Sequence, residues 1–201
     1  LHRIDDLHDD DRHFTLTPEE ILLINPNTKN CPIFRSKRDA EITKAVYRRV
    51  PVLVNEEKGE AGNPWGVSFL RMFDMAGDSH LFRTREEMEA AGFMLDGNRF
   101  VKGDEVWLPL YEGKMIWQYD HRYGSFHEVE NHSSAQLPTT VSENYSNANY
   151  QITPWYWVLS SEVETRCTGV KKWTFAYRGV TNATNARTII LSLIPCYAVN
   201  H

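Results

Sequence analysis

Two acids and a lysine in the middle of the chain are the residues with the clearest potential for chemistry. Asp104 precedes Glu112 by eight residues, and Lys114 completes a Glu-x-Lys triplet. Metal-dependent nucleases use such a set, in which two carboxylates hold a divalent cation and the lysine activates water. Glu-x-Lys triplets are common in proteins, which weakens this signal. A metal-dependent nuclease is therefore kept as the alternative function for this chain.

Other chemical motifs are missing from the sequence. It has no GxGxxG, GxxxxGK[ST], HExxH or GxSxG, which argues against the common dinucleotide-binding, P-loop, zincin and hydrolase classes. His121 follows Asp120, whose carboxylate is placed to orient an imidazole, although a lone histidine is often structural. Cys31, Cys167 and Cys196 form no CxxC pair, so neither a disulfide framework nor a zinc site is indicated. We expect a reducing, cytoplasmic compartment.

The formal net charge of −5 over 201 residues arises at one end of the chain. Residues 1–20 hold seven acids and two bases, and the remainder is neutral. Within that neutral body, residues 35–49 hold six bases and two acids, and residues 165–201 hold five bases and no acid. Such basic segments bind polyanions, because phosphate contacts are local, but a solvated surface has the same composition.

Composition places the chain among ordinary globular proteins, with 41% hydrophobic and 24% charged residues. No apolar run approaches the roughly 20 residues that cross a bilayer, so no membrane partner is expected. The first residue is not Met, and the opening residues resemble no secretory signal. We therefore expect a piece of a longer polypeptide.

Capping residues predict short helices over 18–24, 37–49 and 85–91. In the second of these, Ile42 and Val46 lie on one side, and the bases Lys37, Lys44 and Arg48 lie on the opposite side and are expected to face outward. Strands are expected at 51–54, 65–73, 101, 106–108, 155–159, 173–177 and 188–194. The last is continuously apolar, as in a strand buried on both faces.

These elements predict an α+β fold, a mixed sheet with a few short helices and long loops. The expected division is an acidic segment at 1–20 followed by a single domain at 21–201, with a polar loop or insertion at 130–151. Aromatic residues make up 12% of the chain and often neighbour arginine, as in 117–123 and 173–178. Such clusters suit stacking on nucleic-acid bases, and they also suit an ordinary core.

Several segments in linked order resemble a known family. They are 31–40 (CPIFRSKRDA), 63–69 (NPWGVSF), 71–75, 78–84, 108–116 (LPLYEGKMI), 119–122, 154–158 (PWYWV) and 178–188 (RGVTNATNART). Together they are similar to the region C-terminal to the catalytic domain in large adenine-specific DNA methyltransferases. Those enzymes belong to restriction-modification and phage-defence systems, often with methylase and nuclease in one polypeptide.

The resemblance implies a target-recognition domain, which reads DNA while a separate domain of the same polypeptide transfers methyl from S-adenosylmethionine. The family's Gly-rich cofactor loop is absent here, as is its Asn-Pro-Pro-aromatic tetrapeptide, since Asn63-Pro64-Trp65 has a single Pro. We therefore expect no catalysis and no cofactor in this fragment, with S-adenosylmethionine bound elsewhere in the full-length protein.

The expected partner is double-stranded DNA, in which phosphate contacts fix position and base-edge contacts give specificity. Candidate phosphate contacts are Lys37, Arg38, Lys44, Arg48, Lys171 and Lys172. Candidates for contacts near the bases are Arg122, Tyr123 and Arg187. Each of these also fits an ordinary surface or packing residue.

Overall fold

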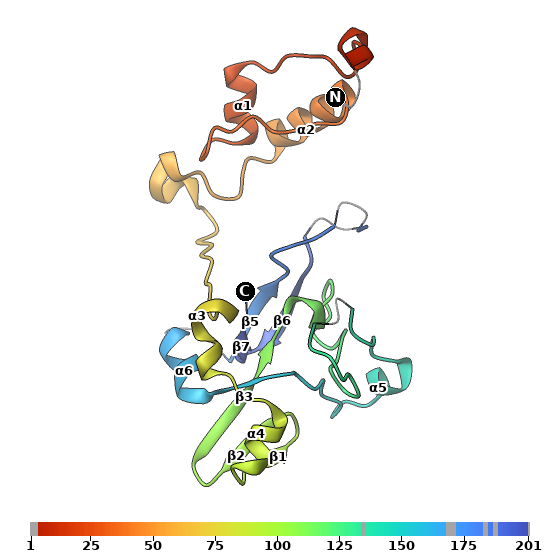
Figure 1. The fold of residues 1–201 in the computed structure, drawn as a ribbon. Coiled ribbons are helices and arrows are strands. Elements are labelled where there is room, and N and C mark those ends of the chain that lie inside the picture. The colour runs from red at the N-terminus through yellow and green to blue at the C-terminus, as the bar shows by residue number, and fades with distance from the viewer. Residues whose placement is uncertain (1–3, 134–135, 168–171, 183–184, 187–188, 201) are drawn as a thin grey trace. The chain divides into compact units, whose positions relative to one another are not determined.

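The computed structural model describes residues 4–133, 136–167, 172–182, 185–186 and 189–200. The chain packs as two compact units, Leu1–Phe69 and Leu70–His201, each with its own elements (Figure 1). The protein is α+β, with a mixed sheet and a few short helices, as predicted. Among the described residues, no helix has the length and apolar character needed to span a bilayer.

Side-chain caps start both α-helices of the first unit, which have the bounds predicted from the sequence. Thr17 accepts a hydrogen bond from the N–H of Glu20, whose carboxylate accepts one from the N–H of Thr17. Ser36 caps the next helix by accepting from the N–H of Asp39. The elements of this unit are η1 (Ile4–His8), α1 (Pro18–Ile24), α2 (Lys37–Arg49) and η2 (Glu56–Gly62).

The acidic N-terminal segment is part of the first unit, which differs from the predicted division at residue 20. The N–H of Lys37 donates to the carbonyl of Asp11 at 2.6 Å. The Lys44 ammonium donates to the Glu20 carboxylate at 2.6 Å, which joins α2 to α1. These contacts attach Asp11 and Glu20 to α2, and the two compact units of the structure meet at 69/70.

The side of α2 that packs inward is not its apolar side. Ala40 is fully buried and Lys44 is 5% exposed, whereas Ile42, Val46 and Val50 are each more than half exposed. The predicted outward position of Lys44 is therefore wrong. The small side chain of Ala40, one turn before Lys44, leaves room for α1, and the ion pair with α1 compensates the enclosed ammonium.

None of the described residues in the ranges 51–54 and 65–73, where strands were predicted, forms a strand element. The Asn63 side chain donates to the Val67 carbonyl at 2.8 Å and accepts from the Val67 N–H at 2.9 Å. Such local bonds compete with a strand ladder, and Gly66 has a positive φ of 59°. In this segment Phe73 alone pairs, in an isolated bridge with Asn200.

A five-stranded sheet organises the second unit. Its strands are β1 (Met94–Asp96), β2 (Arg99–Lys102), β3 (Glu105–Tyr111), β4 (Trp157–Leu159) and β7 (Ala198–Val199). β1 to β4 lie in that order and are antiparallel, whereas β7 pairs with β3 in parallel, which makes the sheet mixed. A turn at Gly97 links β1 to β2, with a φ of 65° that glycine adopts readily.

Trp157 anchors the packing of this sheet against α4 (Arg85–Ala90). Its side chain is 1% exposed, its ring meets Phe100 edge-on at 4.9 Å, and its N–H donates to the Asn98 carbonyl at 2.7 Å. Met88 of α4 completes the cluster. No described residue of the first unit belongs to any of the three hydrophobic clusters, so the core lies in the second unit.

The other helices of the second unit are short. They are α3 (Met75–Asp78), η3 (Ser79–Leu81), η4 (Gly113–Met115), α5 (Ser142–Ser146) and α6 (Ser160–Arg166). Arg166 joins α6 to α3, because its guanidinium donates to Asp78 and to the Met72 carbonyl, both at 2.9 Å. Apart from α5 and an isolated bridge between Thr139 and Gly124, the described residues of the predicted polar loop at 130–151 are irregular.

A separate antiparallel ribbon consists of β5 (Trp173–Tyr177) and β6 (Leu191–Pro195). β5 has the predicted bounds. β6 is not buried on both faces as predicted, because Ser192 and Ile194 are buried while Leu193 is 46% exposed. A two-stranded ribbon packs one face on the core and leaves the other uncovered. Thr188, at the predicted start, lies outside the described residues.

Candidate nucleic-acid interface

One face of the β5–β6 ribbon is aromatic and exposed. We call it the ribbon face, and its residues are the opposed pairs Trp173 and Pro195, Phe175 and Leu193, and Tyr177 and Leu191. Residues opposed in an antiparallel pair point to the same side, and alternate residues of a strand do so too. The three aromatic side chains are 44%, 64% and 47% exposed, in chain order.

The opposite side of the ribbon fixes this orientation. Ala176 and Ile194 are buried with Tyr111 and Met115 in one hydrophobic cluster. Because the side-chain period of a strand is two, burying these residues forces their neighbours outward. The exposure of the ribbon face therefore follows from the register that buries the small and aliphatic residues.

An arginine lies on an aromatic stack at the end of β5. The rings of Trp117 and Tyr123 are stacked at 5.1 Å and 24°, and the Arg178 guanidinium carbon lies 4.8 Å from the Trp117 ring centroid. Arg178 Nε and Nη2 donate to the Ile116 carbonyl at 3.1 and 2.8 Å. Burial lowers the pKa of Arg178 from its ordinary value, but a guanidinium remains protonated at neutral pH. We call Trp117, Tyr123 and Arg178 the Trp117 stack.

A tight turn fastens an exposed tyrosine beside the ribbon. The N–H of Trp117 donates to the Asp120 carbonyl at 2.8 Å, and the N–H of Tyr119 donates to the Leu191 carbonyl at 2.8 Å. Tyr119 has a φ of 64°, which is uncommon for a residue other than glycine, and its side chain is 78% exposed. The turn therefore places a further aromatic residue at the edge of β6.

The predicted DNA contacts of the first unit divide into two groups. Lys37, Arg38 and Arg48 are exposed on α2. Lys44 is enclosed by hydrogen bonds to Glu20 at 2.6 Å and Glu41 at 2.7 Å, and these bonds raise its pKa above the ordinary value. Lys44 is therefore a structural residue, and the other three remain candidates for phosphate contacts.

In the second unit, Lys172 is exposed directly before β5, and Tyr123 lies in the Trp117 stack. Arg122 is half-buried, donates to the Asn147 carbonyl at 3.2 Å and lies over the Tyr145 ring at 5.5 Å, so it holds the 145–147 segment. Lys171 and Arg187 lie outside the described residues.

His121 does not have Asp120 as a hydrogen-bond partner, a pairing that the sequence offered beside the structural interpretation of a lone histidine. The Asp120 carboxylate instead accepts from the N–H of Arg122 at 2.8 Å and from the Tyr145 hydroxyl. Burial, followed by the charge of Arg122, lowers the pKa of His121 below its ordinary value. The Asp120 carboxylate, bonded to Arg122 and Tyr145, therefore does not orient the His121 imidazole.

Asp104 lies far from the other two residues of the alternative nuclease site, Glu112 and Lys114. Asp104 lies in the turn before β3 and Glu112 follows its end, so this seven-residue strand holds them roughly 25 Å apart. Glu112 instead lies 2.9 Å from His132 and 3.6 Å from Lys114. Among the described residues, no group of three metal-ligating side chains is close enough to hold an ion. Glu112 thus ties β3 to the loop at His132.

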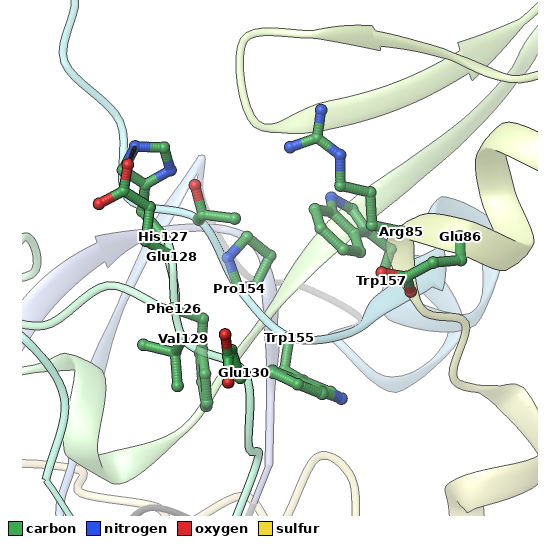
Figure 2. Close-up of a pocket in the computed structure, with 11 residues that line it drawn as sticks. Arg85, Glu86, Phe126, His127, Glu128, Val129, Glu130, Pro154, Trp155 and Trp157 are labelled. Carbon is green, nitrogen blue, oxygen red and sulfur yellow. Dashed lines mark ion pairs between the residues drawn. The ribbon is translucent and has the colours of Figure 1, made fainter.

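A pocket of about 290 Å³ lies between α4 and the 126–130 segment (Figure 2). Its charged lining includes the carboxylates of Glu86, Glu128 and Glu130. Arg85 also lines it and is already paired with Glu89 at 2.7 Å. This acidic lining repels a polyanion, so the ribbon face with the Trp117 stack is the better nucleic-acid interface.

No protein-family model matches this chain, and comparison with curated proteins and with solved structures finds no match either. The ribbon face and Tyr119 were not among the site residues predicted from the sequence. A usable signal was present, because Trp173, Phe175 and Tyr177 alternate with the smaller residues Thr174 and Ala176. That alternation indicates a strand with one aromatic face.

Proposed function

We propose that this chain is a DNA-recognition module of an adenine-specific methyltransferase and is not itself catalytic. One observation carries the proposal: the segment 165–201 contains five bases and no acid, and its exposed Lys172 lies directly before an exposed aromatic face. Cations contact phosphates without regard to sequence, and aromatic side chains contact bases. The exposed bases of α2 supply a second set of phosphate contacts in the first unit.

The finer parts of the proposal rest on the family resemblance. The fold proposed for the chain is that of a target-recognition domain in a restriction-modification or phage-defence system, acting in the cytoplasm on double-stranded DNA. Methyl transfer and S-adenosylmethionine binding belong to a catalytic domain of the same polypeptide, because the cofactor loop and the adenine-gripping tetrapeptide are missing from this sequence.

Fluorescence anisotropy of a labelled duplex tests the proposal. We expect affinity for a 30-base-pair duplex of mixed sequence to fall steeply as salt rises, because binding releases condensed counterions. Lys172→Ala should weaken binding and reduce the salt slope by about one, whereas Arg99→Ala, an exposed base on β2, should change neither. Absence of salt-dependent duplex binding would overturn the proposal, as would calorimetric binding of S-adenosylmethionine to this chain.

A further inference from the structure

Most side chains of the ribbon face cannot form the hydrogen bonds that recognise base edges in the grooves of a duplex. Base edges are read by side chains that donate or accept hydrogen bonds, such as arginine and asparagine. Phe175, Leu193 and Pro195 have no such side-chain groups. Aromatic rings instead stack on the faces of bases, and those faces are accessible only where the bases are unpaired and unstacked.

We propose that the ribbon face binds single-stranded DNA by stacking bases on Trp173, Phe175 and Tyr177. This inference rests on the proposed DNA-binding function and names the form of DNA that this surface takes. The duplex contacts proposed above then come from the exposed lysine and arginine side chains, and the unpaired bases meet the ribbon.

The geometry of β5 suits a row of stacked bases. Alternate residues of a strand lie about 6.8 Å apart, so the three aromatic residues form a row of roughly 14 Å. The Trp173 and Phe175 rings are 5.9 Å apart and inclined at 78°, an edge-to-face contact that turns the two ring planes in different directions. With 64% exposure, Phe175 at the centre of the row is the most open of the three.

Charge favours DNA over a second copy of this chain as the occupant. Lys172, which is exposed, directly precedes the aromatic row, whereas Arg178 after the row is held on the Trp117 stack. A polyanion with bases and phosphates matches that pattern of rings and charges. A second ribbon docked face to face would offer no carboxylate from its own acid-free segment, 165–201, to pair with Lys172.

The experiment compares a fluorescein-labelled 20-nucleotide single strand with a duplex of the same sequence, both by anisotropy on the full chain. Base–aromatic stacking corresponds to about 1–3 kcal/mol per base, so Phe175→Ala and Trp173→Ala should each weaken single-strand binding roughly 5- to 150-fold. Duplex affinity should change by less than about twofold, because the grooves do not contact these rings.

Matched controls come from the first unit, where Phe69 and Trp65 are 67% and 80% exposed. Phe69→Ala and Trp65→Ala should leave single-strand affinity unchanged. Phe175→Tyr keeps a ring that can stack and should restore binding, which separates stacking from a general loss of structure. An unchanged melting temperature in Phe175→Ala is expected, since this side chain is exposed.

Three results would overturn the inference. The first is an unchanged affinity for the single strand in both Phe175→Ala and Trp173→Ala. The second is an equal loss of affinity for the single strand and for the duplex. The third is self-association of the chain in sedimentation that these alanine substitutions abolish. A parent chain that binds duplex but no single strand would also overturn it and leave the proposed function standing. A parent chain that binds neither form would overturn both.

Discussion

The Lys44 ammonium lies 2.6 Å from the Glu20 carboxylate, on the side of α2 that is enclosed by α1. This ion pair makes Lys44 a structural residue, although its place in the sequence is that of an outward base beside Lys37 and Arg48. The exposed cations of the helix are therefore a different set from the one that helical periodicity indicates.

Lys44→Ala should destabilise the first unit without weakening DNA binding. Removing the ammonium leaves Glu20 without its partner on α2, and we expect the melting temperature to fall by about 2–4 °C. Lys58→Ala, which removes an exposed lysine of η2, is the control and should leave stability unchanged. Weaker DNA binding with an unchanged melting temperature would show that Lys44 faces a ligand instead.

Replacing Lys37, Arg38 and Arg48 together by alanine should have the opposite effect. We expect weaker binding to every duplex tested and a salt slope reduced by up to about three, because each side chain contributes at most one phosphate contact. The melting temperature should stay the same, since all three side chains are exposed. Duplex affinity equal to that of the parent would mean that this helix is merely solvated.

Acid should loosen the contact between α1 and α2. The hydrogen bond from Lys44, followed by the backbone bond at Thr17, lowers the pKa of Glu20 below its ordinary value of 4.5. A carboxyl group with a lowered folded-state pKa stabilises the fold above its unfolded pKa, and that stability is lost as pH falls through the folded value. Thermal unfolding followed between pH 3 and 6 should show this loss, and Glu20→Gln should reduce it.

Trp157→Phe should lower the free energy of unfolding by roughly 1–3 kcal/mol. The change removes the N–H bond to the Asn98 carbonyl and part of the packing on Phe100. Urea denaturation measures the effect. Trp65→Phe, at an 80% exposed position, should stay within about 0.5 kcal/mol of the parent. Equal effects at the two positions would contradict the packing described for Trp157.

Glu112→Gln should affect stability and not metal chemistry. Its carboxylate is 11% exposed and bonded to His132, so the neutral amide should loosen the loop there and lower the melting temperature. Adding 5 mM Mg²⁺ should change neither the melting temperature nor the integrity of plasmid DNA in parent or variant. A Mg²⁺-dependent rise in melting temperature that the variant lacks would restore a metal-binding role for Glu112.

Local chemistry was sufficient for much of the secondary structure. Thr17, Ser36 and Thr84 each cap a helix close to its predicted bounds, because a cap depends on neighbours within three residues. The predicted strand at 173–177 likewise has the bounds of β5. The predicted strands at 51–54 and 65–73 were wrong, since a strand also needs a partner, and Asn63 gives its side chain to the local backbone instead.

Tertiary structure decided which side chains share a surface. The sequence placed Asp104 and Glu112 eight residues apart, but an extended β3 separates them, whereas Arg178 and Trp117 meet across 61 positions. Periodicity shows which residues share a helix face, but only packing against α1 determined that Lys44 is enclosed. The physical reason is the sequence separation of the interacting residues. Caps and turns depend on adjacent residues, whereas burial, strand register and ion pairs depend on segments that folding brings together.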